Sequence, residues 1–345
     1  MSSQEKKQRA GRNRTIELTQ DDRVRLRPRL LTLSSLNELD TPPQSTVLGD
    51  AVQAASRLPT GFVDLMILDP PYNLTKSFNG RKFTKCPVDE YATWLDGVVG
   101  AFRHLLKPTA TVYVCGDWLT SASIFNVCSA HFIVRNRITW EREKGRGAQA
   151  NWKNCSEDIW FCTCSDNYTF NVDAVKLRRK VIAPYRHDDG SPKDWMQESG
   201  GNFRDTHPSN LWTDISVPFW SMPENTDHPT QKAEKLIAKL VLASTNLGDF
   251  VFDPFLGSGT TSVVAKKLGR RYLGIELDEE FCLLAERRLE LAESRNEIQG
   301  FADGVFWERN TLSIQQRHVS GNGRPPAERL LFSDATEGAN GDDPE

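Results

Sequence analysis

Long hydrophobic runs are missing from this 345-residue sequence, and every apolar stretch ends well short of the ~18 residues that a membrane-spanning helix needs. The first residues, MSSQEKKQRAGRNR, are basic but have no apolar stretch behind them, so they lack the pattern of a secretory signal. The seven cysteines form an odd-numbered set scattered from Cys86 to Cys282, which argues against a disulfide scaffold. We therefore expect a reduced, intracellular protein in the cytoplasm.

Signatures of several other protein classes are also missing. No internal repeat occurs at the periods typical of solenoids. Cys162 and Cys164 lack a second pair at zinc-binding spacing, and the six histidines form no ligand cluster, so we predict no metal site. Hydrophobic residues make up 38% and charged residues 26% of the chain, which excludes a fully disordered protein. The length allows one large globular domain or two ordinary ones.

The net charge of −3 says little, but the charges are unevenly distributed. Between His131 and Arg186 there are eleven lysines and arginines and six acidic residues, and aromatic side chains alternate with them. These aromatics are Trp140, Trp152, Trp160, Tyr168, Phe170 and Tyr185. Such a basic strip suits a phosphate backbone and exposed bases, although a solvated charged face remains the alternative. The composition of residues 1–45 predicts a basic, partly disordered N-terminal arm. The composition of residues 296–345 predicts a C-terminal extension with an acidic, disordered tail.

Strands and helices alternate through residues 46–295, which predicts a parallel α/β sheet in one central domain. The apolar run within 62–73 ends at two prolines, and residues 249–269 read as a short strand, a glycine-rich turn and a helix. We expect further strands in ATVYVCG, IVRNRITWER and RRYLGIEL, and helices in AFRHLLKP, AEKLIAKLVLAS and DEEFCLLAERRLELAES. Residues 171–225 interrupt this alternation and are rich in Pro, Gly, Asp and Ser, which indicates a loop-rich insert.

The glycine-rich turn DPFLGSGTT lies where a strand gives way to a helix. Gly257 and Gly259 have no Cβ, so the backbone can turn tightly and approach a ligand, while the helix start offers free N–H groups. Glu276 ends the next strand, where an acid typically binds both hydroxyls of a ribose. Ser262 stands where the dinucleotide fingerprint has its third glycine, which disfavours a dehydrogenase, and the absence of a Gly-Lys step excludes a P-loop. Glycines that merely allow close packing remain the alternative.

A second motif, Asp69-Pro70-Pro71-Tyr72, follows the first apolar strand. Proline has no N–H and a fixed φ, so the turn presents rigid carbonyl acceptors beside the ionised Asp69. Two converging acceptors suit a group with two N–H donors, such as an exocyclic amine, and Tyr72 adds a flat face for a planar ring. The motif therefore predicts a site for an aromatic amine, although a simple turn at a strand end would look the same in isolation.

Three motifs together, DPPY at 69–72, HPTQK at 228–232 and DPFLGSGT at 253–260, resemble the beta-class amino DNA methyltransferases, the N6-adenine and N4-cytosine family. The resemblance runs from about Val47 to about Ala292 and is typical of modification methylases in bacterial type II restriction–modification systems. It implies a Rossmann-like, S-adenosylmethionine-dependent methyltransferase fold with a seven-stranded, mostly parallel sheet. It also implies a circularly permuted motif order, in which DPPY precedes the glycine motif, and a target-recognition region in the insert at 171–225.

The resemblance also assigns site residues. The implied catalytic pocket consists of Asp69, Pro70, Pro71 and Tyr72. The residues implied to bind S-adenosylmethionine are Asp50, Ala51, Thr230, Gln231, Lys232, Asp253, Phe255, Gly257, Ser258, Gly259, Thr260 and Glu276. Within this set, Glu276 is the ribose acid and Asp50 lies near the adenine. Lys232 would meet the methionine carboxylate, together with Thr230 and Gln231 at a helix start.

The implied substrate is a base extruded from double-stranded DNA, because its amino group is otherwise paired and stacked. Asp69 and the Pro70 carbonyl would hold the two N–H groups, and the amine would attack the sulfonium methyl in line without a covalent intermediate. We expect adenine N6 rather than cytosine N4, because Asp is commoner than Ser at the first motif position of adenine enzymes. A protein-amide methyltransferase usually carries Asn there and reverses the motif order. A non-catalytic DNA-binding module would not require the motif.

Basic residues near the catalytic turn and in the strip are candidates for DNA contacts. They are Lys76, Arg81, Lys82, Arg142, Lys144, Arg146, Lys153, Arg178, Arg179 and Lys180. The polar loop 74–90 is expected to close over the extruded base. A cognate restriction endonuclease is the implied functional partner, without a stable complex, and the protein would associate with the bacterial nucleoid. The oligomeric state stays open, with a homodimer as one arrangement.

Overall fold

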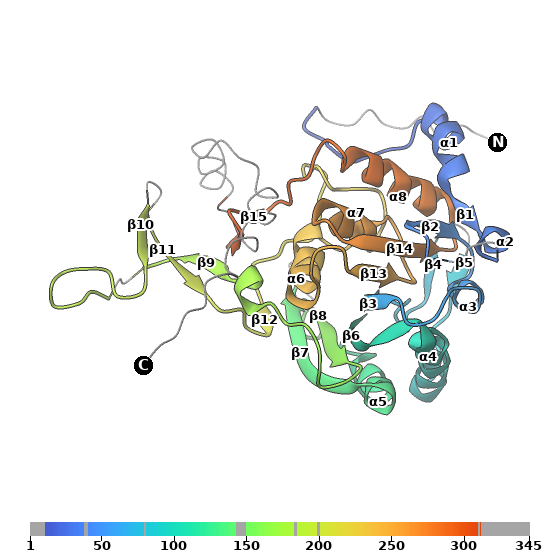
Figure 1. Ribbon diagram of the computed structural model, residues 1–345, viewed down its shortest axis with the longest axis horizontal. Coiled ribbons are helices and arrows are strands. Elements are labelled where there is room, and N and C mark those ends of the chain that lie inside the picture. Colours follow the sequence, from blue (N-terminus) through green and yellow to red (C-terminus); the bar gives the residue numbers. More distant parts are fainter. Residues whose placement is uncertain are drawn as a thin grey trace, which may run out of the picture.

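A mixed β-sheet runs through the centre of the molecule (Figure 1). The computed structural model describes residues 11–37, 41–78, 81–142, 150–182, 185–198, 201–309 and 311. Within them the main sheet has nine strands in the order β1-β2-β14-β13-β3-β6-β8-β7-β12. Neighbouring strands are parallel, except that β8 runs antiparallel to β6 and β7. The bounds are β1 Leu31–Thr32, β2 Ser45–Leu48, β3 Val63–Leu68, β6 Leu106–Gly116, β7 Ile133–Glu141, β8 Ser156–Thr163, β12 Leu211–Trp212, β13 Phe250–Asp253 and β14 Arg271–Glu276.

The central strands are apolar because both faces of the sheet are covered. All four residues of β13 are buried, and in β3 only Asp64 is partly exposed. The strands expected from the sequence are therefore confirmed in position. The predicted count of seven is wrong for the described sheet, because two-residue strands, β1 and β12, pair at its two edges.

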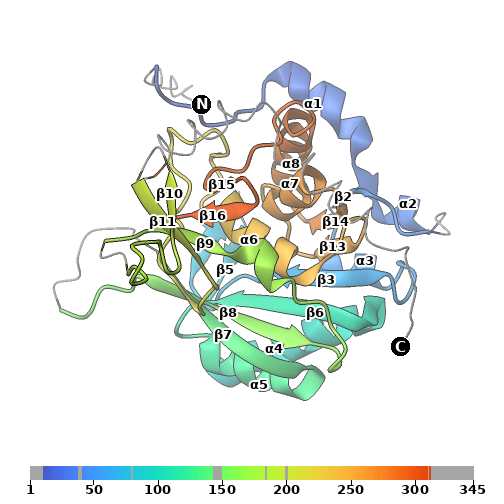
Figure 2. The same ribbon diagram turned by 60° about the vertical axis from the view of Figure 1, so that its left-hand side comes forward.

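Helices cover both faces of the sheet and enclose two hydrophobic clusters (Figures 1 and 2). One cluster includes side chains of α6, α7 and α8, and the other includes side chains of α3, α4 and α5. The helices are α3 Ala51–Ala55, α4 Val88–Phe102, α5 Ser121–His131, α6 Glu234–Ser244, α7 Thr260–Lys267 and α8 Glu279–Leu291. None of the helices in the described residues is both long enough and apolar enough to cross a membrane.

A second, five-stranded sheet projects beside the main one within the described residues and has the order β10-β11-β9-β16-β15 (Figure 2). Its strands are β9 Leu177–Lys180, β10 Met196–Glu198, β11 Gly201–Thr206, β15 Phe301–Ala302 and β16 Val305–Trp307. The predicted insert supplies β9 to β11, and the predicted C-terminal extension supplies β15 and β16. Two lysines of α6 join this region to the domain, because Lys235 and Lys239 lie 2.6 and 2.9 Å from the Asp214 carboxylate.

Part of the predicted N-terminal arm is folded. Helix α1 (Gln20–Leu26), the short 3-10 helix η1 (Arg27–Arg29) and helix α2 (Leu33–Leu36) lie within it. Arg23 pairs with Glu280 of α8 at 2.5 Å, and neighbouring arginines make similar pairs. Farther upstream, the Arg14 N–H donates to the Trp220 carbonyl at 2.7 Å, and the Ile16 N–H donates to the Asn225 carbonyl at 2.8 Å. The positively charged segment is therefore held by acidic residues of α8 and by the backbone of residues 220–225.

Two local predictions need correction. The segment 74–90, expected to be a loop, contains the paired strands β4 (Lys76–Phe78) and β5 (Arg81–Phe83) and the start of α4. The segment AFRHLLKP, expected to be a helix, leaves the helix at Phe102, passes through a 3-10 turn and enters β6 at Leu106. Leu106 pairs with Val63 of β3, so sheet pairing overrides the local helical pattern.

Candidate active site

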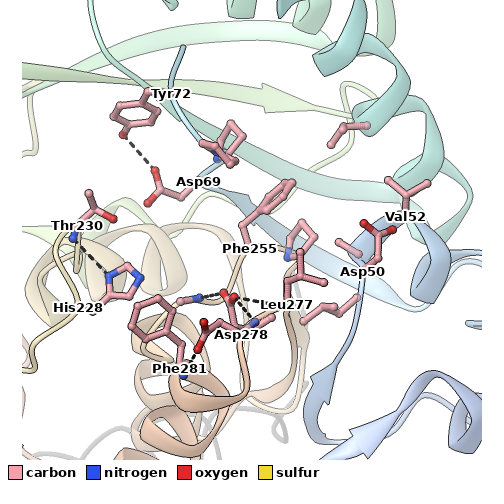
Figure 3. A pocket seen from close by; sticks show the side chains of 18 of the residues that line it. Asp50, Val52, Asp69, Tyr72, His228, Thr230, Phe255, Leu277, Asp278 and Phe281 are labelled. Carbon is pink, nitrogen blue, oxygen red and sulfur yellow. Dashed lines mark hydrogen bonds between the residues drawn. The ribbon is translucent and has the colours of Figure 1, made fainter. Parts of the chain in front are cut away.

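A cavity of about 330 Å³ lies at the carboxyl ends of the central parallel strands. Its walls include residues that directly follow β2, β3, β13 and β14, which is where open α/β sheets bind ligands. In Figure 3, Asp69 and Tyr72 lie at one end, Asp50 and Val52 at the other, and Phe255 between them. Tyr72 and Gly257 both line this cavity, so the proline turn and the glycine turn share one space.

The proline turn follows β3 directly, and hydrogen bonds fix its acidic residue. The Tyr72 hydroxyl donates to Asp69 Oδ1 at 3.1 Å, and Lys232 Nζ donates to Asp69 Oδ2 at 2.6 Å. The Tyr91 hydroxyl of α4 donates to the Pro71 carbonyl at 3.3 Å, which fastens the turn to the helix. Burial and the charges of Asp69 and Glu157 raise the pKa of Tyr72 well above its usual value, so the phenol stays protonated.

Lys232 lies deeper in the site than the sequence suggested. Burial lowers its pKa, but the carboxylates of Asp69 and Glu157 outweigh burial, and the net pKa of Lys232 is raised. Its side chain is 9% exposed and lies 3.4 Å from Glu157. The predicted helix start at Thr230 and Gln231 is wrong, since α6 begins at Glu234. The role of Lys232 toward the cofactor remains a prediction.

Gln231 supports the turn before α6, whereas Thr230 faces the cavities. The Gln231 side chain accepts from the Thr226 hydroxyl at 2.6 Å and donates to the Glu224 carbonyl at 2.7 Å, so it braces the turn before α6. It lines a small cavity of about 30 Å³ behind the main one, together with Ser258 and Thr260. Thr230 lines both cavities.

The two glycines of the turn have separate reasons for lacking a side chain. Gly257 has φ 54°, and a Cβ there would lie 2.9 Å from His228 Nε2, inside the main cavity. Gly259 has φ 86°, and a Cβ there would lie 2.5 Å from the Ala285 Cβ of α8. The first glycine therefore keeps the ligand space open, and the second allows close packing between α7 and α8. The alternative that a glycine of this turn merely allows close packing therefore applies to Gly259.

Glu276 is held by the backbone. Its Oε2 accepts from the Gly257 N–H at 2.9 Å, and its Oε1 accepts from the N–H groups of Leu277 and Asp278 at 2.8 and 2.9 Å. Burial raises the pKa of Glu276, while these three hydrogen bonds oppose that rise. The carboxylate lines the cavity, and its Oε2 can accept from a further donor.

Asp253 and Asp50 support the site from two sides. Burial raises the pKa of Asp253 to about 7, although its carboxylate accepts from the Phe255 N–H at 3.0 Å. Asp253 lines the small rear cavity rather than the main one. Asp50 caps α3 by accepting from the Gln53 N–H at 2.9 Å, and it lines the main cavity with Ala51.

His228 closes the cavity above the glycine turn. Its ring packs edge-on against Phe281 with 4.4 Å between ring centres, and its Nδ1 accepts from the Thr230 N–H at 3.4 Å. Burial, assisted by the charge of Lys232, lowers the pKa of His228 to about 4, so the ring is neutral near pH 7. His228 therefore helps to shape the turn before α6.

Several lining residues were missed by the sequence analysis. They are Val52, Leu74, Trp94, Val98, Pro254, Ile275, Leu277, Asp278 and Phe281. Leu277 and Asp278 directly follow Glu276, so their place after a strand end was a usable signal. Trp94 and Val98 come from α4, and nothing in their local sequence indicates that this helix borders the cavity.

The candidate DNA contacts divide into three groups. The side chains of Lys76, Arg81 and Lys82 and the whole of Lys144 and Arg146 lie outside the described residues. Arg142 and Arg178 form ion pairs with Glu157 and Asp205, respectively. Lys153, Arg179 and Lys180 are exposed, with Arg179 near Glu308 at 3.8 Å. The predicted basic strip is therefore not a uniform surface of free cations among the described residues.

Comparison with known proteins adds independent observations. The family model described as "DNA methylase" matches residues 63–287. "DNA adenine methyltransferase YhdJ" of Escherichia coli (strain K12) is 32% identical over 256 residues, which cover 72% of this chain and 83% of that protein. "Type II methyltransferase M.HpaI" of Haemophilus parainfluenzae is 30% identical over 261 residues, covering 75% of this chain and 76% of that protein. The solved structure of "PvuII DNA methyltransferase (cytosine-N4-specific)" has a TM-score of 0.52 at 16% identity, covering 74% of this chain and 93% of that chain.

The family match spans both motifs that meet in the cavity. The sequence relatives confirm the expected family, and the solved structure confirms the expected methyltransferase fold. The chain therefore belongs to the DNA methylase family and is an amino DNA methyltransferase, of the N6-adenine or N4-cytosine type, that uses S-adenosylmethionine.

Proposed function

We propose that Asp69, Pro70 and Tyr72 hold a base extruded from double-stranded DNA while its exocyclic amino group is methylated. The observation that carries this proposal is the shared cavity, into which both the proline turn and the glycine turn open. A protein that only bound DNA would not require a carboxylate and a rigid proline turn beside a cofactor-sized space.

The chemistry follows from what the proline turn presents. An exocyclic amine is a poor nucleophile because its lone pair is delocalised into the ring. When Asp69 and the Pro70 carbonyl accept its two N–H groups, the nitrogen moves toward tetrahedral geometry and its lone pair becomes localised. Bound S-adenosylmethionine supplies an electrophilic sulfonium methyl. The bond from nitrogen to the methyl carbon forms as the bond from that carbon to sulfur breaks, and positive charge develops on the amine, where the Asp69 carboxylate stabilises it. The methylated amine then loses one proton to solvent, and the demethylated cofactor leaves as a neutral thioether.

The remaining lining residues fit the cofactor. Glu276 keeps acceptor capacity for a ribose hydroxyl, because its three backbone bonds leave one lone pair open on Oε2. Gly257 keeps the space beside His228 clear, and Phe255 and Leu277 offer apolar walls. The donors of Lys232 already face Asp69, Tyr72 and Glu157, so a methionine carboxylate would have to share one of them. We assign the cofactor to this half of the cavity and the base to the half beside Tyr72.

Replacing Asp69 tests the assignment. Asp69→Ala and the nearly isosteric Asp69→Asn should each reduce tritium transfer from labelled S-adenosylmethionine to DNA by about 100-fold or more. Cofactor binding, measured by equilibrium dialysis, should largely survive. Asp166→Ala, which removes an 87% exposed carboxylate, is the matched control and should retain activity. Near-normal transfer by both Asp69 variants would refute the assigned chemistry.

Adenine N6 is the proposed target atom. It is supported by Asp69 at the first motif position and by the adenine specificity in the name of the Escherichia coli relative. Cytosine N4 is the alternative, because the PvuII enzyme is named for that base. Nucleoside digestion of methylated DNA followed by mass spectrometry should yield N6-methyladenine. A yield of N4-methylcytosine would overturn the base assignment while leaving the reaction class intact.

The wider setting is also proposed. The second sheet lies mostly within the insert 171–225 that the resemblance assigns to target recognition, so we place sequence recognition there.

A cognate restriction endonuclease is the proposed functional partner, and the name of the Haemophilus relative supports this. Co-expression provides the test, because the methylated host DNA should resist a restriction enzyme that cuts the same sequence. Nucleoid association and a homodimer remain proposals that microscopy and light scattering can test.

A further inference from the structure

A second buried carboxylate lies beside the catalytic turn and belongs to none of the recognised motifs. Glu157 comes from β8, the strand that runs against the direction of its neighbours, and it is 4% exposed. Its Oε2 lies 3.2 Å from the Tyr72 hydroxyl and 3.4 Å from Lys232 Nζ. Its Oε1 pairs with Arg142, the residue that follows β7.

Glu157 and Asp69 share the same two donors. The Tyr72 hydroxyl has one hydrogen, and it faces Asp69 Oδ1 at 3.1 Å and Glu157 Oε2 at 3.2 Å. A single hydrogen cannot fully satisfy both oxygens. Lys232 Nζ likewise faces both carboxylates, at 2.6 Å from Asp69 and 3.4 Å from Glu157. Whichever carboxylate takes the hydroxyl hydrogen therefore leaves an acceptor site open on the other.

This sharing matters because Asp69 needs a free lone pair to accept an N–H of the substrate. We propose that Glu157 is a positioning residue that takes the Tyr72 hydroxyl hydrogen, and part of the Lys232 charge, away from Asp69 when the target amino group arrives. Arg142 pairs with Glu157 and fixes its other oxygen. The inference rests on the proposed function of Asp69 and adds a residue through which Asp69 is made available.

Several other ionisable groups surround the two carboxylates. Lys232 and Arg142 are the cations in contact with the two carboxylates, and the Tyr72 hydroxyl lies between them. The buried Cys115 thiol of β6 and the Asp253 carboxyl of β13 also act on this group of charges. Tyr91 of α4 and His228 lie within range of Asp69 and Lys232, respectively. Replacing Glu157 by glutamine therefore leaves Lys232 and the Tyr72 hydroxyl more fully engaged with Asp69.

The test separates catalysis from cofactor binding. Glu157→Gln should lower kcat at saturating DNA and cofactor by about 10- to 100-fold, the size expected for a lost hydrogen bond to a charged group. The affinity of Glu157→Gln for the cofactor should stay within about twofold of the native value. This is well under the tenfold change in affinity that corresponds to about 1.4 kcal/mol of binding free energy.

A double-mutant cycle with Tyr72→Phe separates positioning from a general structural effect. Without the shared hydrogen, Glu157→Gln should cost less in the Tyr72→Phe background than in the native one. Glu286→Gln on α8 removes another buried carboxylate and should leave kcat unchanged. Native kcat in Glu157→Gln, or equal losses in both backgrounds, would overturn the inference. If Asp69→Ala still abolishes transfer in that case, the proposed function stands without it.

Discussion

Individual polar atoms in the cavity have defined partners, and those partners determine what each residue can do. Glu276 is fixed by three backbone N–H groups and still has one lone pair, on Oε2, for a ligand. Gln231 has its side-chain oxygen and its amide engaged within its own turn, so it supports the site instead of lining the main cavity. The residue type alone therefore does not distinguish a ligand-facing group from a supporting one.

Asp253 gives a prediction about pH. The pKa of its carboxyl is raised to about 7 in the folded protein from 3.8, so the folded state holds a proton that the unfolded state has released. The stability linked to this proton is complete below about pH 4 and is lost as pH rises through about 7. Asp253→Asn keeps an oxygen for the Phe255 N–H and should remove this dependence, with a relative gain on the order of a few kcal/mol at pH 8.

Urea unfolding at pH 5 and pH 8 measures this effect. The native protein should lose stability between the two values relative to Asp253→Asn, after the contribution of His228 is accounted for. The pKa of His228 is lowered to about 4, so its contribution has the opposite sign and is lost as pH falls below about 6.5. Parallel stability curves for the two proteins would contradict the burial argument.

Secondary-structure elements were largely predictable because β3, β13 and β14 are apolar runs that end at recognisable turns. Each of these strands delivers one predicted group, Asp69, Asp253 or Glu276, at its carboxyl end. Where the prediction failed, tertiary pairing decided the outcome, as at Leu106, which pairs with Val63. The place of Glu157 could not be predicted, because it depends on β8 lying antiparallel between β6 and β7.

The two glycines of the turn before α7 lead to a prediction that separates helix packing from cofactor binding. Gly259→Ala places a methyl group 2.5 Å from Ala285 at a positive φ, so it should push α7 from α8 and reduce the free energy of unfolding by about 1–3 kcal/mol. Gly257→Ala meets the His228 ring in the cavity and should instead weaken cofactor binding more than a stability loss explains. Thermal unfolding and equilibrium dialysis of both variants separate the two effects. Equal losses of binding and stability in the pair would show that the glycines share one role.

Across the whole molecule, the basic strip of the sequence is spread over different environments. Trp140 is buried and donates to the Ile215 carbonyl, whereas Trp152 is 94% exposed. Arg178 packs over Trp307 and pairs with Asp205, so it stabilises the second sheet. The segment 150–155, which precedes β8 and carries Lys153, lies on the same edge of the sheet as Asp69. Linear charge counting could not separate these environments.

Lys153 leads to a prediction about the salt dependence of DNA binding. If it contacts a phosphate, Lys153→Ala should reduce the slope of log K against log salt concentration by about 0.9. Fluorescence anisotropy with a labelled duplex measures the slope between low and moderate salt. Lys107→Ala, on the opposite edge of the sheet beside Asp64, is the matched control and should leave the slope unchanged. An unchanged slope for Lys153→Ala would show that the segment 150–155 is not part of the DNA-binding surface.

The backbone bonds from Arg14 and Ile16 to residues 220 and 225 have a practical consequence for protein engineering. Residues 220–225 lead directly into the Thr226 and His228 turn, so a tag, truncation or insertion near residue 16 would disturb the wall of the main cavity. Fusion partners are therefore better attached through a spacer that leaves these two peptide groups in register.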